Sequence, residues 1–156
     1  MATHQNPCEI CGKIERALRG ELPNFICETP NGIAILGEVQ KFRGYSVLLC
    51  KHPVTELDQL PRTTKLAFLE EMSLLAQAVQ TVTRCHKINY EALGNIVPHF
   101  HWHVFPRYET DEYSTQPVWN HIPQGEDATP FLFDAERDAQ LLHDIRRELQ
   151  KLLQNN

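Results

Sequence analysis

The sequence lacks a long apolar segment, a surplus of basic residues and a hydrophobic leader, and each absence excludes a class of protein. No apolar run approaches the roughly 18 residues that a membrane-spanning helix needs. Lys and Arg number 15 against 20 Asp and Glu, a net charge of -5, so the chain is a poor candidate for binding duplex DNA or anionic lipid. Residues 1–7 are polar and lack a signal-peptide core. We therefore expect a cytoplasmic protein with no membrane or nucleic-acid partner.

Cysteine is too scarce and too scattered for a disulfide framework. There are five cysteines, and only Cys8 and Cys11 are close in sequence. The other three lie among apolar residues, as small buried side chains do: Cys27, Cys50 and Cys85. A Cys-x-x-Cys pair followed by glycine indicates metal or redox chemistry. The short polar segment before it does not resemble the strand that a thioredoxin-like motif follows, which favours a zinc knuckle.

Short apolar runs separated by turn signals predict a single α+β domain over residues 1–156, without internal repeats. The expected elements are a helix over 13–19, strands over 25–27, 33–36, 45–50, 88–93 and 97–105, a long helix from 63 or 64 to about 86, and a C-terminal helix capped by Asp134. The nearly all-apolar run 45–50 favours a central strand. Pro106 is expected to end the last strand, and 107–130 read as a long loop. The order predicts an antiparallel sheet covered by a long central helix and a C-terminal helix.

Three histidines alternate with apolar residues in the segment 99–105, His-Phe-His-Trp-His-Val-Phe. Successive side chains of a strand point to opposite faces, so His99, His101 and His103 are expected to share one face, about 7 Å apart. The apolar alternates can then pack under a helix. A half-buried strand whose polar face happens to be histidine is the plain alternative, but alternation alone predicts polar residues there, not three imidazoles.

A row of three imidazoles suits two kinds of chemistry. One is a catalytic zinc site, which some hydrolases build from a His-x-His pair and a third histidine. Three consecutive positions on one face form a line, however, and a line suits a single tetrahedral ion poorly. The other is nucleophilic catalysis, because neutral imidazole predominates at pH 7 and can attack phosphorus. A protonated neighbour could then stabilise the charge that develops on the phosphate.

The segment 99–105, with Pro106-Arg107 after it, resembles the His-φ-His-φ-His-φ-φ signature of the histidine triad (HIT) superfamily of nucleotide hydrolases and transferases. Further similarity lies in the Cys8/Cys11 pair, in Arg43-Gly44-Tyr45 before an apolar strand and in Lys51-His52-Pro53-Val54 before the long helix. The resemblance covers about residues 8–108, which leaves 109–156 as a C-terminal loop and helix. The stretch 89–95 is similar to the bacterial branch described as diadenosine tetraphosphate hydrolase-like.

This resemblance implies roles for individual residues. His101 aligns with the nucleophile that forms a covalent nucleotidyl-histidine, and His103 with the histidine that contacts the α-phosphate and the leaving oxygen. Asn95 lies where the family has an amide near the phosphate. The family often follows that amide with Ser or Thr, whereas this chain has Ile96, so the hydroxyl contact is missing. Glu38 lies near the position of the residue that holds the ribose hydroxyls.

HIT relatives with an N-terminal Cys-x-x-Cys use a Cys-Cys-His-His zinc, which here implies Cys8, Cys11, His52 and His99 as ligands. With four protein ligands and no open position, such a zinc would be structural. The alternative is that His52 is a solvated residue at a strand end and that the cysteines bind no metal.

Two further residues are candidates for substrate binding. Arg107 could contact a phosphate, although an arginine after a strand is more commonly a plain surface residue. Trp119 could stack on a base or reach across a dimer interface, or it could simply anchor the loop that carries it.

The resemblance implies a homodimeric enzyme acting on a small-molecule nucleotide, with no organic cofactor. It would hydrolyse a phosphoanhydride or phosphoramidate at the α-phosphate, in a diadenosine polyphosphate-like or phosphoramidate substrate. The alternatives are a nucleotidyltransferase or phosphorylase of the same superfamily, a zinc hydrolase with the triad as ligands, and a nucleotide-binding adaptor with little turnover.

Overall fold

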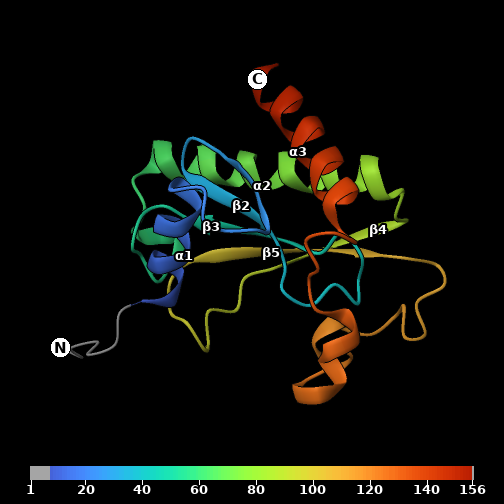
Figure 1. Cartoon of the computed structure of the whole chain (residues 1–156). Coiled ribbons are helices and arrows are strands. Elements are labelled where there is room, and N and C mark those ends of the chain that lie inside the picture. Colours follow the sequence, from blue (N-terminus) through green and yellow to red (C-terminus); the bar gives the residue numbers. More distant parts are fainter. Residues whose placement is uncertain (1–7, 156) are drawn as a thin grey trace.

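Five antiparallel strands form one sheet in the computed structural model, which describes residues 8–155 (Figure 1). The helices and strands are α1 (Glu9–Leu18), β1 (Phe25–Glu28), β2 (Gly32–Leu36), β3 (Ser46–Cys50), α2 (Arg62–Thr83), β4 (Lys87–Glu91), β5 (His101–Arg107) and α3 (Ala139–Gln154). The strand order is β1-β2-β3-β5-β4. The predicted α+β class, the central place of β3, the long helix and the C-terminal helix are confirmed. Residues 1–7, where we expect no signal peptide, lie outside the described part.

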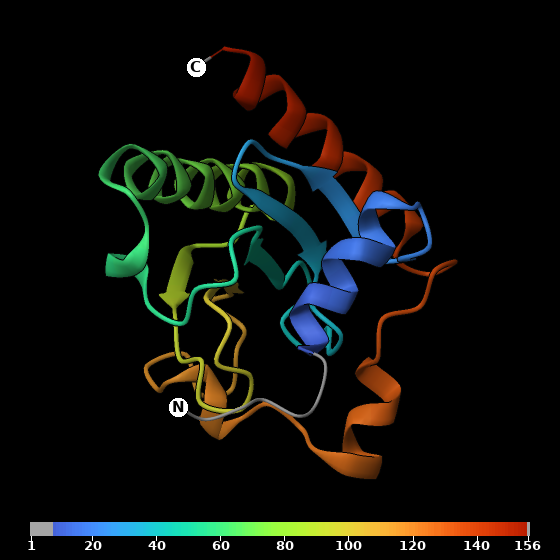
Figure 2. The ribbon, with the colours of Figure 1, turned by 90° about the vertical axis from the view of Figure 1, so that its left-hand side faces the viewer.

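Both faces of the sheet are covered, so β2 and β3 are buried along their whole length. On β2, Ala34 and Leu36 pack into the cluster formed with α2 and α3. The alternate residues Ile33 and Ile35 pack into a second cluster on the other face, formed with α1. Figure 1 shows α2 and α3 on one side of the sheet and the segment 118–131 on the other, and Figure 2 shows α1 against the strands. None of the described helices is long and apolar enough to span a bilayer.

Strand β5 begins later and ends later than predicted. We expected it to begin at residue 97, but pairing with β3 begins only at His101, opposite Leu49. His99 therefore precedes the strand and does not share its regular alternation. The prediction that one strand carries all three histidines is wrong for the first of them.

Pro106 does not end β5, contrary to our prediction, because it lies where its missing N–H costs nothing. It pairs with Ile88 of β4. The carbonyl of its neighbour Arg107 accepts a hydrogen bond from the His86 N–H on the β4 side, so the nitrogen of Pro106 faces the opposite side. There the pairing of β5 with β3 has already ended at Val104.

The remaining differences are at the boundaries of elements. Helix α1 begins at Glu9 rather than at 13, and α2 begins directly after Pro61 rather than at a threonine cap. The carboxylate of Asp134 accepts two backbone N–H bonds, but it caps the turn that precedes α3. The helix itself begins after the buried Asp138.

The predicted loop after β5 has structure of its own. It contains two short 3-10 helices, Val118–Asn120 and Gly125–Phe131. An isolated bridge joins Val39 to Leu132 and ties the segment to the loop after β2. The segment is thereby held beside the face of the sheet that carries the histidines.

Candidate active site

A cavity of about 440 Å³ opens between α1, the sheet and the loops around residues 95 and 119. Most of its wall surface is apolar, with aliphatic side chains such as Ile10, Leu49 and Ile122 contributing to it. The histidine pair lies in this cavity, with the ring centres of His101 and His103 4.6 Å apart. The cavity is therefore suited to a ligand that has a flat apolar group against the aliphatic side chains and a small polar group beside the two histidines.

The His101 ring is held in one tautomer by the backbone. Its Nδ1 lies 2.6 Å from the carbonyl oxygen of His99. A carbonyl can only accept, so Nδ1 carries the proton and Nε2 keeps its lone pair. Burial lowers the pKa of His101, although the bond to His99 acts in the opposite direction. The ring is thus neutral at pH 7, and Nε2 is available as a nucleophile.

His103 is neutral in the free protein, unlike the protonated neighbour that the sequence analysis considered. Burial, and then the adjacent His101, lower the pKa of His103 to about 3. Its Nδ1 lies 2.6 Å from the hydroxyl oxygen of Tyr45. Without a bound anion, this ring can offer an N–H group but not a positive charge.

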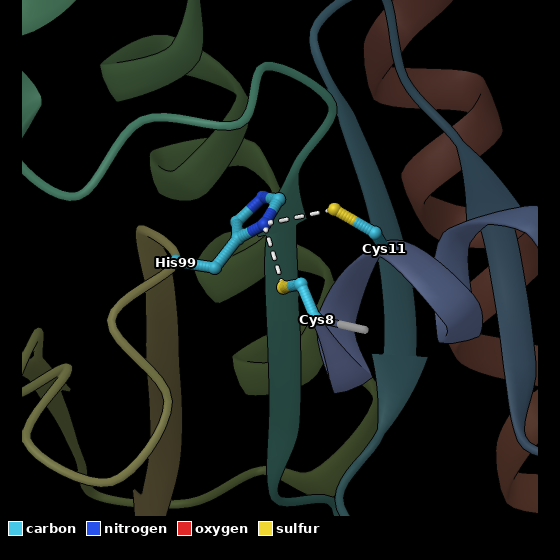
Figure 3. A group of neighbouring side chains, drawn as sticks. All are labelled: Cys8, Cys11 and His99. Carbon is cyan, nitrogen blue, oxygen red and sulfur yellow. Dashed lines mark hydrogen bonds between the residues drawn. The ribbon is translucent and has the colours of Figure 1, made fainter. Parts of the chain in front are cut away.

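The His99 side chain does not lie in a row with those of His101 and His103. It lies beside the two N-terminal cysteines (Figure 3). Its Nδ1 lies 3.4 Å from the sulfur of Cys8 and 3.5 Å from that of Cys11. Its Nε2 donates to the carbonyl oxygen of Cys50 at 2.7 Å, which directs the lone pair of Nδ1 toward the sulfurs. Zinc bound at ordinary lengths would separate tetrahedral S and N ligands by about 3.5 Å. The three residues therefore fit a zinc ion.

His52, the fourth ligand that we predicted, is not part of this group. The ligand atoms of Cys8, Cys11 and His99 all lie within 4.8 Å of one another, and no other residue in 8–155 joins them. His52 is exposed just after β3. The structure thus brings together three of the four predicted ligands.

Three of the predicted substrate-binding residues line the cavity: Asn95, Glu38 and Trp119. The Trp119 ring meets His103 edge-on with centres 4.9 Å apart, and its indole N–H donates to the carboxylate of Glu91. Asn95 lies in the exposed loop before β5. Beside it, Ile96 is 96% exposed at the rim of the cavity.

Arg107, expected to meet a phosphate, instead holds the loop that follows β5. Its side chain is 3% exposed and does not line the cavity. The guanidinium donates to four partners, namely the side chains of Asp111 and Asn89 and the carbonyls of Tyr113 and Gln116. Four of the five N–H donors of its planar fork are engaged in this network.

Sequence reasoning missed four polar residues of the cavity: Glu9, Lys13, Tyr45 and Gln124. The ammonium group of Lys13 lies 2.7 Å from carboxylate oxygens of both Glu9 and Glu38. Burial opposes its charge, but the hydrogen bonds to Glu38 and Glu9 prevail and raise the pKa of Lys13. The spacing of Glu9 and Lys13 on a helix was the only local signal. The contact with Glu38 depends on the tertiary structure.

Comparison with known proteins shows the family. A model of the HIT domain matches residues 20–110, more than half of the chain. The chain therefore belongs to the HIT domain family. A curated relative, the adenylylsulfatase HINT3 of Arabidopsis thaliana, is 27% identical over 70% of this chain. The match covers 57% of that relative, so this chain corresponds to little more than half of its length.

Solved structures share the fold. A histidine triad protein of Bradyrhizobium japonicum is 24% identical, with a TM-score of 0.70 over 81% of this chain and 91% of its own. One from Marinobacter aquaeolei is 23% identical, with a TM-score of 0.70 over 88% and 95%. A zinc-bound histidine triad family protein of Mycobacterium smegmatis is 22% identical, with a TM-score of 0.63 over 96% and 97%.

The three-residue group predicts which substitutions remove metal. The purified protein should contain about one zinc per chain, and His99→Ala should lose most of it because Nδ1 is a ligand. Its melting temperature should fall by about 2–4 °C for each kcal/mol of lost metal-binding energy. Elemental analysis and thermal melts test this, with His52→Ala as the control that should keep its zinc. Loss of zinc in both variants would make His52 a ligand, and zinc-free native protein would exclude the site.

The four hydrogen bonds of Arg107 predict a structural effect of its replacement. Arg107→Lys keeps the charge but cannot reach all four acceptors, so the free energy of unfolding should fall by about 1–3 kcal/mol. The KM for a nucleotide substrate should stay unchanged, because the side chain lies outside the cavity. Urea titration and steady-state kinetics measure the two effects. A raised KM with unchanged stability would return Arg107 to the substrate site.

Proposed function

We propose that this protein is a nucleotide hydrolase in which His101 attacks the α-phosphorus of a bound nucleotide. The observation that carries the proposal is the 2.6 Å bond from His101 Nδ1 to the His99 carbonyl, because it leaves a neutral ring with a free lone pair on Nε2 in the cavity. Membership of the HIT family supports a nucleotide substrate. The relative named as an adenylylsulfatase supports hydrolysis.

The reaction has two steps. The lone pair of His101 Nε2 forms a bond to phosphorus, and the bond from phosphorus to the leaving oxygen or nitrogen breaks with its electron pair. An amine leaving group takes up one proton from solvent as it departs. Water then attacks the nucleotidyl-histidine and releases one proton to solvent, the P–N bond to His101 breaks, and the ring regains its lone pair. Throughout, the His99 carbonyl can stabilise the positive charge that the ring acquires on attack.

The other residues of the cavity would position the substrate. We place the base against the aliphatic wall and the α-phosphate at the histidine pair, where a neutral N–H of His103 can donate to a phosphate oxygen. Glu38 at the cavity wall is available to the ribose hydroxyls, and Trp119 packs against His103 from the other side. Asn95, which lines the cavity from the loop before β5, is available to the phosphate.

A zinc ion held by Cys8, Cys11 and His99 would have a structural task. When bound, it would join the start of α1 to the segment before β5 through three protein ligands. The ring of His99 lies in this group, while its carbonyl holds the ring of His101. Fixing the side chain of His99 therefore also fixes the acceptor that orients the nucleophile.

The charges of the cavity favour a leaving group with little negative charge. Its charged residues are Glu9, Lys13 and Glu38, and the one lysine already pairs with both carboxylates. Both histidines are neutral. A polyphosphate chain needs cationic partners, so we infer that a neutral amine leaves more readily from this site than a polyphosphate.

Replacing the nucleophile should abolish turnover. His101→Asn should lower kcat by at least about 1000-fold while nucleotide binding persists, since the covalent step is lost. His143→Asn, an exposed position on α3, is the matched control and should be unaffected. Release of nucleoside monophosphate and acid-labile labelling of the protein are the measurements. Normal turnover by the His101→Asn variant would exclude the mechanism.

Because the pKa of His101 is lowered, the acidic limb of the pH profile of kcat/KM should fall below pH 6.5 in the wild type.

Removing one negative charge from the cavity should alter the choice of leaving group. Glu9→Gln should raise kcat/KM for a dinucleoside tetraphosphate relative to an adenosine phosphoramidate by roughly five-fold, the effect of about 1 kcal/mol. The ratio cancels the intrinsic reactivities of the two substrates, and high salt should shrink the change. The same substitution at the exposed Glu136 should leave the ratio unchanged. If the ratio of the two kcat/KM values is unchanged in both variants, the charge of the cavity does not select the leaving group.

A further inference from the structure

The side chain of Tyr45 ends on the second histidine of the cavity. Its hydroxyl oxygen lies 2.6 Å from His103 Nδ1, and the two residues are 8% and 9% exposed. The Tyr45 ring also stacks on Phe105, with centres 3.9 Å apart and planes within 5°. The ring thus has fixed neighbours on its face and at its tip.

The surrounding backbone allows this ring one position. A side chain at Gly37 would place its Cβ 2.1 Å from two carbons of the Tyr45 ring, so only glycine leaves room for it. The Tyr45 carbonyl accepts hydrogen bonds from the Gly37 N–H and from the Gln40 side chain, at 2.8 and 2.9 Å. The contact between Tyr45 and His103 is therefore built into the fold.

The direction of the hydrogen bond follows from what each partner can do. Burial raises the pKa of Tyr45, so the hydroxyl keeps its proton. In the part of the chain that the structure describes, this hydroxyl has no partner besides His103, and a buried hydroxyl proton needs an acceptor. A neutral His103 that donated from Nδ1 would leave that proton without an acceptor. A hydroxyl that donates to Nδ1 satisfies both groups with one bond.

We propose that Tyr45 is a positioning residue, whose hydroxyl donates to His103 Nδ1 and so keeps the ring proton on Nε2, facing the cavity. The two catalytic histidines then hold opposite tautomers. The His99 carbonyl keeps the proton of His101 on Nδ1 and leaves a lone pair on Nε2. Tyr45 keeps the proton of His103 on Nε2, because the lone pair on Nδ1 accepts the hydrogen bond from the tyrosine hydroxyl. One ring presents a nucleophile and its neighbour presents a donor to the phosphate, with no charge on either.

The tautomer follows from the geometry of the free protein alone, whereas its effect on rate rests on the proposed function. In nitrogen-15 spectra of histidine-labelled wild-type protein, His103 should bear its proton on Nε2 and His101 on Nδ1. Tyr45→Phe keeps the ring and its stacking but removes the donor, so His103 should become a mixture of tautomers. We expect kcat to fall about 10- to 100-fold, less than the loss of a whole phosphate donor, with little change in KM. Tyr90→Phe, at an exposed tyrosine of β4, should behave as wild type.

Each outcome decides the proposal. A wild-type spectrum with the His103 proton on Nδ1 overturns it, and this measurement holds even if Tyr45→Phe fails to fold. A variant that keeps the Nε2 tautomer also overturns it, whether or not its kcat falls. If the wild-type protein hydrolyses no nucleotide, the proposed function fails, while the spectra still decide the role of Tyr45.

Discussion

The pairing of β5 with β3 is the contact on which the site depends. It places His101 opposite Leu49 and His103 opposite Val47, with both imidazoles on the face that α1 and the cavity occupy. The opposite face of β5 is buried against the helical layer through residues such as Val104. A slip by one residue would exchange these faces and bury the imidazoles among apolar side chains. Burial of the apolar side chains of β5 therefore fixes the strand register and, with it, the position of the histidine pair.

His99 joins the two polar parts of the molecule because it precedes the strand instead of belonging to it. Its ring faces the cysteines of α1, and its carbonyl faces the ring of His101. A metal bound by this group would thus influence catalysis without touching a substrate. In the proposed mechanism, His99 links a Cys-x-x-Cys pair more than 80 residues away in sequence to the ring of the nucleophile.

Burial gives the cavity its chemical character. It keeps His101 and His103 neutral, so the proposed chemistry depends on which nitrogen carries a proton rather than on a fixed positive charge. The two hydrogen bonds that select the tautomers come from different parts of the fold, a backbone carbonyl and a tyrosine hydroxyl. The lysine of the cavity is neutralised by two carboxylates, which leaves the substrate site without a free cation among the described residues.

The sequence by itself determined the α+β class, the central strand, the histidine pair on one face and the family, because these are written in local patterns. Alternation of polar and apolar residues indicates which side chains share a face of a strand, and an apolar run indicates a strand that is buried on both faces. The triad signature is a contiguous stretch of sequence. Only the tertiary structure decided the environment of each side chain. Arg107 became a loop anchor because four acceptors surround it, and Pro106 stayed in the strand because its neighbour β3 had already ended. Tyr45 reaches His103 across 58 residues of chain, and Lys13 reaches Glu38 from a helix. No local pattern encodes such contacts, because they depend on how distant segments are brought together by packing of the whole sheet.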